Sequence, residues 1–204
     1  MDHKERILVK SHELFNRYGI RSVSMDDIAA QLGVSKKTLY QYYTDKDELV
    51  NAVFDGVLST NKTQCVDCTK KGENAIHEVF LSFDIVEEML KTMNPSVLFD
   101  MQKYHPSAYK KFDDFRNGFL YRIIKANLER GIREELYREE IDTDILSRYR
   151  LYSVLLSFNP EVFPTSKTNV AYIEQQLLEL FLFGMATLKG QKLIQKNKNQ
   201  RTKK

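Results

Sequence analysis

The sequence has little of several residue types on which particular protein classes depend. It contains two cysteines and no tryptophan in 204 residues, and two cysteines are too few for the disulfide framework of a small secreted domain. No stretch approaches the roughly 18 consecutive apolar residues that a membrane span requires. The opening residues, MDHKERILVK, carry both charges where a secretion signal has its apolar core. We therefore expect a cytoplasmic protein without a membrane partner.

Motifs of the common enzyme classes are also absent from the sequence. It has no H-E-x-x-H zinc motif, no glycine-rich phosphate loop and no nucleophile elbow. Cys65 and Cys68 form a C-x-x-C, but no second such pair and no pair of histidines accompanies it. Two chains could combine their cysteines in one site, so thiol-based redox chemistry or metal sensing stays open as an alternative. We expect no enzyme, no catalytic residue, no metal site within one chain and no cofactor.

The charges are distributed unevenly along the chain. The formal net charge is +3, but the last sixteen residues hold seven of the 31 basic residues and no acidic one. The rest of the chain therefore has 24 basic residues against 28 acidic ones and is mildly acidic. Basic tails sometimes contact nucleic acid, but a frayed, solvated terminus is the more common structure. We expect residues 191–204 to form a basic, flexible tail.

The strongest local pattern lies at residues 23–49, VSMDDIAAQLGVSKKTLYQYYTDKDEL. Ser24 and Ser35 have the positions of helix N-caps, whose hydroxyl oxygens accept bonds from backbone amides of the first turn. Gly33 stands where the first of the two helices must end. The segment therefore predicts two short helices joined by a tight turn, followed at once by the start of a third.

The apolar and polar residues of this segment fall on opposite sides of the two helices. Ile28, Leu32 and Leu39 are expected to pack together behind the turn. The outward side of the second helix carries positive charge and hydrogen-bond donors from Lys36, Lys37, Thr38, Tyr40, Gln41 and Tyr42. A solvated surface explains any one of these residues. As a set on one short helix, they suit the major groove of DNA.

The stretch LGVSKKTLYQYYTDKDEL resembles the helix-turn-helix of TetR-type transcriptional repressors, which reads roughly L-G-V-s-x-x-T-L-Y-x-y-F-x-s-K-e-x-L. The positions that match include Gly33, Val34, Thr38, Leu39, Tyr40, Lys46 and Leu49. The resemblance extends upstream and covers about the first fifty residues. Tyr43 departs from the pattern because phenylalanine is commoner there, and its hydroxyl needs a partner or a route to solvent.

The resemblance implies an all-α protein with two functional parts. Residues 1–48 would form a three-helix DNA-binding domain with the helix-turn-helix, and residues 49–190 a larger helical domain for effector binding and dimerisation. The implied function is a ligand-responsive transcriptional regulator, most simply a repressor. It would bind a near-palindromic operator in double-stranded DNA as a homodimer and leave it when a small molecule binds.

The resemblance and the outward side of the second helix together suggest a set of DNA contacts. They are Ser24, Lys36, Lys37, Thr38, Tyr40, Gln41, Tyr42 and Lys46. In the family, the positions of Tyr40 and Lys46 usually contact phosphates. Gln41 is the expected base reader, because a side-chain amide can pair with adenine through two hydrogen bonds.

Apolar periodicity and proline positions predict helices through the rest of the chain. Outside the segment above, they are expected at residues 2–18, 45–61, 73–92, 96–103, 107–130, 142–158 and 168–188. The helix at 45–61 would join the DNA-binding part to the remainder without a flexible linker. A break at 61–72 would hold both cysteines, and residues 159–167 would form a loop.

The helix expected at 168–188 contains LLELFLFGMATL and is apolar on almost every side. Such a helix needs a second surface to cover it, which favours a homodimer formed by the C-terminal helices. Phenylalanine and methionine at helical spacing usually belong to the core. If an effector pocket exists, an apolar or aromatic ligand would contact Phe83, Met89, Met93, Met101, Phe112, Phe115, Tyr152 and Phe158. A helical adaptor that never meets DNA is a further alternative.

Overall fold

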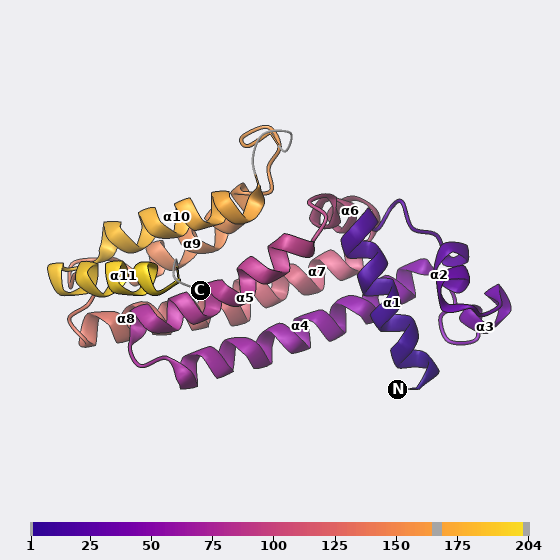
Figure 1. Cartoon of the computed structure of the whole chain (residues 1–204), viewed down its shortest axis with the longest axis horizontal. Coiled ribbons are helices and arrows are strands. Elements are labelled where there is room, and N and C mark those ends of the chain that lie inside the picture. Colours follow the sequence, from indigo (N-terminus) through magenta and orange to yellow (C-terminus); the bar gives the residue numbers. More distant parts are fainter. Residues whose placement is uncertain (1, 165–168, 202–204) are drawn as a thin grey trace. The chain divides into compact units, whose positions relative to one another are not determined.

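The computed structural model of the chain is all-α, as the sequence predicts (Figure 1). It describes residues 2–164 and 169–201. Within these ranges the helices are α1 (His3–Tyr18), α2 (Met25–Leu32), α3 (Lys36–Tyr40), α4 (Lys46–Lys71), α5 (Ala75–Thr92), α6 (Ser96–Tyr104), α7 (Pro106–Asp114), α8 (Tyr121–Arg133), α9 (Thr143–Leu156), α10 (Val170–Met185) and α11 (Leu188–Arg201). A π-helical segment, Phe115–Leu120, separates α7 from α8. The described residues form no β-strand, only an isolated pairing of Tyr137 with Ala186.

The chain divides into two compact units that are not contiguous in sequence. The first unit comprises Met1–Asn61 and Leu90–Phe115, and the second comprises Lys62–Met89 and Arg116–Lys204. Helices α4 and α5 each contribute residues to both units. The boundary at residue 48 that the resemblance implies separates two functions, whereas these units are defined by their compactness. The functional boundary therefore stays a prediction.

The core of the first unit is built around the three N-terminal helices. Phe15 of α1, Ile28 of α2, Leu39 of α3 and Leu49 of α4 are all completely buried in it. Helices α6 and α7 add further apolar side chains, among them Val97, Met101 and Ala108. About fifty residues alone bury little surface, so these two helices enlarge the core on which α2 and α3 rest.

The second unit has its own core and a buried polar network at one end. Its apolar side chains come from α5, α8, α10 and α11, among them Ile76, Phe80, Leu128, Leu182 and Ile194. Arg130 on α8 donates to Glu78 of α5 at 2.9 Å and to the carbonyl oxygen of Gly72 at 2.9 Å. These bonds tie the end of α4 to the adjoining helices.

The break expected at residues 61–72 is wrong, because α4 continues without interruption to Lys71. Cys65 and Cys68 therefore lie on a helix rather than in a loop. The segment NKTQCVDCTKK is polar on most sides, so apolar periodicity gave no sign of a helix there. Its end is held by tertiary contacts, including the bond from Arg130 to Gly72.

The flexible tail expected from residue 191 is also wrong over its described part, which belongs to α11. Ile194 of this helix is completely buried. Arg201 lies 2.8 Å from Asp84 and 2.7 Å from Glu87, both on α5. Lys198 likewise lies 2.6 Å from Glu179 of α10, so two basic residues of this segment have acidic partners in the same unit. Residues 202–204, and the expected helix start at residue 168, lie outside the described residues.

Candidate DNA-binding surface

The turn between α2 and α3 forms for local reasons that the sequence shows. Ser24 accepts a bond from the backbone amide of Asp27, and the Asp27 carboxylate accepts one from the amide of Ser24. Gly33 ends α2 with φ of 68°, in the left-handed region where a side chain is disfavoured. Ser35 caps α3 through the amide of Thr38. All of these expected caps are confirmed.

An apolar contact behind the turn fixes which side of α3 faces outward. Ile28 of α2 and Leu39 of α3 are both completely buried in the same core. Val34 at the corner donates its amide to the carbonyl oxygen of Ala29 at 3.0 Å. Burial of these side chains packs α2 against α3, and the opposite side of α3 is exposed to solvent.

Most of the expected DNA contacts are exposed on this outward side. Lys36, Lys37, Tyr40, Gln41 and Tyr42 are exposed, although α3 ends at Tyr40 and the last two lie in the turn that follows. Ser24 is exposed at the start of α2. Thr38 is half-buried, and its hydroxyl lies 2.8 Å from the hydroxyl of Ser35. The structure brings these side chains to one surface, while their roles in DNA binding stay predictions.

Lys46 is placed differently from the other candidates. Its Nζ donates to the backbone carbonyl oxygen of Ile20 at 2.6 Å, and the side chain is half-buried. Burial lowers the pKa of the Lys46 ammonium, while Asp100 and Asp27 oppose that effect. An ammonium has three donors, so this bond leaves donors for a phosphate while holding the start of α4 against the α1–α2 turn.

Three further side chains of this surface were missed in the sequence. His3 and Lys4 at the start of α1 lie beside the end of the turn: the His3 ring is 6.5 Å from that of Tyr42, and Lys4 Nζ is 5.9 Å from the ring of Tyr43. Asp26 on α2 forms an ion pair with Lys36 on α3. The basic residues of the opening HKER run could have indicated His3 and Lys4 as candidates. No pattern near Asp26 in the sequence predicts its pairing with Lys36.

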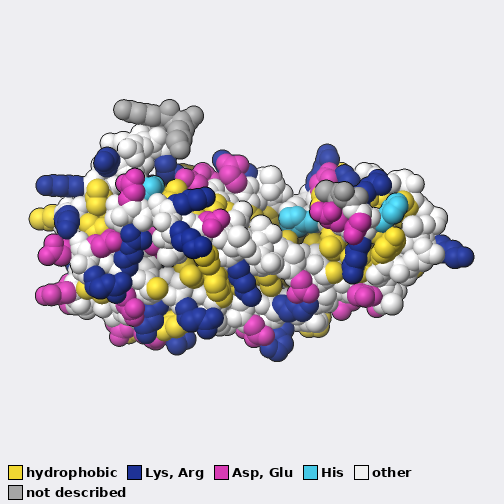
Figure 2. Space-filling view, turned by 90° about the horizontal axis from the view of Figure 1, so that it is seen from below, with side chains coloured by type: hydrophobic (Ala, Val, Ile, Leu, Met, Phe, Trp, Pro, Cys, Tyr) yellow, Lys and Arg dark blue, Asp and Glu magenta, His cyan; other side chains and the backbone are white. Residues whose placement is uncertain are grey.

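Charge on the wider surface is mixed. In the view of Figure 2, lysine and arginine side chains are interspersed with aspartate and glutamate over the face shown. That face carries no single broad basic area.

The eight candidate effector residues are divided between the two units. Met93, Met101, Phe112 and Phe115 belong to the first unit, and Phe83, Met89, Tyr152 and Phe158 to the second. Met101 and Phe83 are buried in the two separate cores, whereas Tyr152 is exposed beneath the guanidinium of Arg116, 4.9 Å from its ring. Their role in effector binding stays a prediction.

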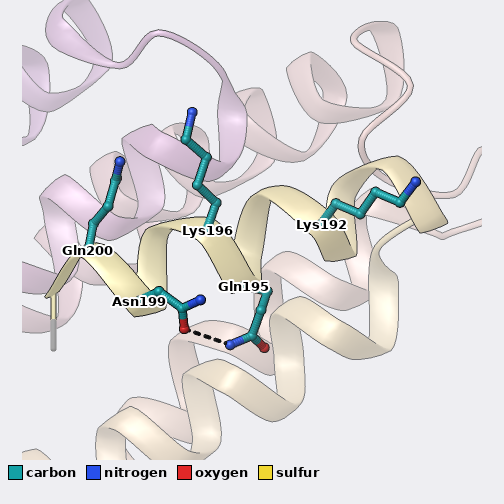
Figure 3. A pocket seen from close by; sticks show the side chains of 5 residues that line it. All are labelled: Lys192, Gln195, Lys196, Asn199 and Gln200. Carbon is teal, nitrogen blue, oxygen red and sulfur yellow. Dashed lines mark hydrogen bonds between the residues drawn. The ribbon is translucent and has the colours of Figure 1, made fainter.

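A surface hollow on α11 offers a different kind of site. It is lined by Lys192, Gln195, Lys196, Asn199 and Gln200 (Figure 3). Lys196 and Gln200 point to one side of the helix, and Gln195 donates to Asn199 at 3.0 Å on the other. Effector pockets are concave and largely apolar, so this polar face of one helix does not fit that description.

The two cysteines lack the features of a reactive pair. Burial raises the pKa of the Cys65 thiol to about 11, and the neighbouring Cys68 adds to this effect. Cys68 is buried at 4% exposure. The thiolate is the reactive form, and with this raised pKa little of the Cys65 thiol is ionised near neutral pH. Within the described residues, no three His, Cys, Asp or Glu side chains are grouped in a way that would hold a metal ion.

Across residues 2–164 and 169–201, none of the helices combines the length and the apolar character that crossing a bilayer requires.

Comparisons with known proteins agree with this geometry. Residues 7–53 match the model for bacterial regulatory proteins of the tetR family. The chain is 29% identical over 158 residues to the uncharacterized HTH-type transcriptional regulator YvaF of Bacillus subtilis, covering 77% of this chain and 82% of that protein.

Solved structures share the fold over most of the chain. A putative transcriptional regulator from Saccharomonospora viridis, in complex with choline, superposes with a TM-score of 0.72 at 18% identity and covers 90% of this chain and 97% of its own. Thermus thermophilus FadR, in complex with lauroyl-CoA, gives 0.57 at 19% identity, covering 91% of this chain and 96% of that one. At this identity the likeness establishes the fold.

Proposed function

We propose that the chain is a TetR-type helix-turn-helix transcriptional regulator, a repressor that binds a near-palindromic operator as a homodimer and is released by a small molecule. The observation that carries this proposal is the capped α2–turn–α3 unit, which rests on a buried apolar contact and leaves Lys37, Gln41 and Tyr42 exposed. A rigid helix with a donor-rich outer side is what major-groove reading requires.

Each exposed side chain has a proposed role that follows from its chemistry. Gln41 reads a base, since its amide can both donate to and accept from adenine. Lys37, Tyr40 and Lys46 contact phosphates, which position the protein without reading sequence. Ser24, Lys36, Thr38 and Tyr42 complete the interface.

A homodimer is supported by apolar side chains that the second unit leaves exposed. On α9, Ile145, Tyr149, Tyr152 and Leu156 lie along one side of the helix, with exposures between 40% and 63%. On α10, Leu180 is 65% exposed. Side chains of this kind, repeated along two neighbouring helices, mark a surface for another protein. Two copies would also present two α3 helices to successive major grooves, whose centres lie about 34–36 Å apart.

Release by a small effector is the part of the proposal that rests on similarity. Structures with the same fold hold choline and lauroyl-CoA. For this chain we propose an apolar or aromatic effector that contacts members of the candidate set, such as Phe83 and Phe158. Helix α4 runs from the reading helices into the second unit, about 39 Å at 1.5 Å per residue. An effector that favours one position of α4 would shift the population of DNA-binding conformations.

The competing functions have less support. Thiol chemistry at Cys65 and Cys68 is disfavoured by the burial of Cys68 and by the raised pKa of Cys65. A helical adaptor without DNA binding leaves the exposed donors of α3 unexplained. We therefore also propose that the protein is not an enzyme, that it works in the cytoplasm, and that residues 1–48 and 49–190 are its functional domains.

Selection of bound sequences from random duplexes tests the proposal. We expect an inverted repeat whose half-sites are centred about one helical turn apart, and binding that weakens steeply as salt rises. Enrichment of no sequence, or binding without salt dependence, would contradict it. Sedimentation of the free protein tests the dimer separately, with Leu180→Glu expected to shift it to monomer.

A further inference from the structure

Asp26 of α2 and Lys36 of α3 form an ion pair on the candidate DNA-binding surface. Lys36 Nζ lies 2.8 Å from Oδ1 of Asp26 and 3.0 Å from Oδ2. The two side chains remain 58% and 63% exposed. Lys36 is the first residue of α3, and the N-terminal residues of a recognition helix are those that contact base edges. The pair is therefore positioned where a base pair would be read.

The fold of the turn does not require Asp26. Ser24 and Asp27 form the capping box of α2 without it, and Ser35 caps α3. An exposed lysine–aspartate pair contributes little to stability. A carboxylate near DNA also opposes binding, because it repels phosphates. Asp26 lies in the first turn of α2, where a carboxylate interacts favourably with the helix dipole. Beside Lys36, the same carboxylate can in addition accept a hydrogen bond from DNA.

Lys36 and its neighbour Lys37 differ in the electrostatics that matter for DNA binding. The hydrogen bond from Lys36 to Asp26 raises the pKa of Lys36, so its ammonium stays protonated, and the adjacent carboxylate offsets that positive charge. Lys37 is exposed and makes no ion pair with another described residue. A lysine already paired with a carboxylate releases few counterions from DNA. Lys36 is thus a poor phosphate anchor, whereas Lys37 is a good one.

We propose that Asp26 and Lys36 act together as a reader of one G·C base pair in each half-site. In the major groove guanine presents two acceptors, N7 and O6, and its cytosine presents an amino donor at N4. The ammonium of Lys36 donates to the guanine and the carboxylate of Asp26 accepts from the cytosine. An A·T pair fits less well, because adenine offers the ammonium one acceptor, N7, where guanine offers two, and beyond its amino donor lie the thymine O4 acceptor and the thymine methyl, neither of which can donate to a carboxylate.

This inference rests on the proposed function, and one experiment distinguishes the failure of each. The wild type, Lys36→Gln, Asp26→Asn and the control Lys37→Gln are each put through selection from random duplexes and salt titration. The wild type is expected to enrich a G·C pair at symmetric positions of both half-sites. Lys36→Gln and Asp26→Asn each lose about tenfold discrimination at that pair alone, while Lys37→Gln keeps it.

The salt dependence supplies a second, independent readout. Lys37→Gln is expected to reduce the slope of log affinity against log salt by about one per protomer. Lys36→Gln reduces it by much less, and Asp26→Asn makes it steeper because Lys36 is then free to meet phosphates. Lys36→Arg is the conservative variant, since arginine also pairs with guanine O6 and N7, and it retains the G·C preference.

Three outcomes would overturn the inference. They are an Asp26→Asn protein that binds all duplexes more tightly with an unchanged motif, a wild-type motif without the G·C pair, and a Lys37→Gln protein that loses the same base preference. A wild type that enriches no duplex would overturn the proposed function instead. Circular dichroism melting of each variant is expected to match the wild type, because both side chains are exposed.

Discussion

Lys46, the first residue of α4, donates a hydrogen bond from Nζ to the carbonyl oxygen of Ile20 across 2.6 Å. The bond connects the start of α4, which follows α3, to the turn between α1 and α2. A side chain expected to serve only DNA thus also has a structural partner. Its two possible roles can be separated by measuring stability and DNA binding in the same variant.

We predict that Lys46→Ala lowers the free energy of unfolding by about 1–2 kcal/mol, because a charged donor is lost from a carbonyl. If Lys46 also contacts a phosphate, the salt slope of DNA binding falls by about one per protomer, equally for all sequences. Urea denaturation and salt titration measure the two effects. Lys110→Ala, which removes an exposed pair with Asp114, is the control. An unchanged slope would leave Lys46 with the structural role only.

Gln41→Ala is expected to remove preference at one base position of each half-site, worth about 1–3 kcal/mol. Gln41 is exposed, so thermal stability should not change. Binding to a set of operators with single substitutions measures the effect, with Gln31→Ala on α2 as the exposed control. Equal weakening on every operator would assign Gln41 to backbone contact.

Tyr43→Phe is expected to stabilise the protein by about 1 kcal/mol, which denaturant unfolding would detect. The ring is buried at 2% exposure and its hydroxyl has no hydrogen-bond partner among the described residues. Burial raises the pKa of this hydroxyl, with Glu48 and Asp2 adding to the shift. A buried hydroxyl without a partner costs free energy that phenylalanine avoids. The exposed Tyr42→Phe is the control, and a destabilised Tyr43→Phe would show that the hydroxyl makes a favourable contact.

The reactivity of Cys65 should follow its pKa of about 11. Only the thiolate is alkylated, so in a Cys68→Ala background the rate with iodoacetamide should rise about tenfold per pH unit until the pH approaches that value. Mass spectrometry of quenched samples measures the rate. Cys65→Ser with Cys68→Ala should leave DNA binding and its release by effector unchanged. A rate that levels off near pH 8 would revive the thiol-sensor alternative.

Among the ion pairs of the described residues, breaking that of Arg150 on α9 with Glu174 on α10 should lower the free energy of unfolding most. The atoms lie 3.0 Å apart, and the Glu174 side chain is completely buried. Arg150→Met leaves that carboxylate without its cation, at an expected cost of about 3–5 kcal/mol in unfolding free energy. The double variant Arg150→Met with Glu174→Leu should recover most of this loss. A double variant as unstable as the single one would contradict the prediction.

The helix-turn-helix was predictable because its determinants lie within a few residues of one another. The hydroxyls of Ser24 and Ser35 cap helices that begin at the next residue, and Gly33 takes the left-handed conformation that ends α2. The polar extension of α4 and the whole of α11 escaped prediction, since neither shows an apolar period. The end of α4 is stabilised by the hydrogen bond from Arg130 to Gly72. Helix α11 is stabilised by the ion pairs of Arg201 with Asp84 and Glu87.

The sequence by itself determined the class of the protein, the reading helix and the direction in which that helix faces. These follow from caps and apolar spacing, which act through bonds between near neighbours. Only the tertiary structure decided that Asp26 meets Lys36, that Lys46 meets Ile20, and that the candidate effector residues divide between two units. Such pairings depend on how helices far apart in the chain cross, and no local pattern encodes that geometry.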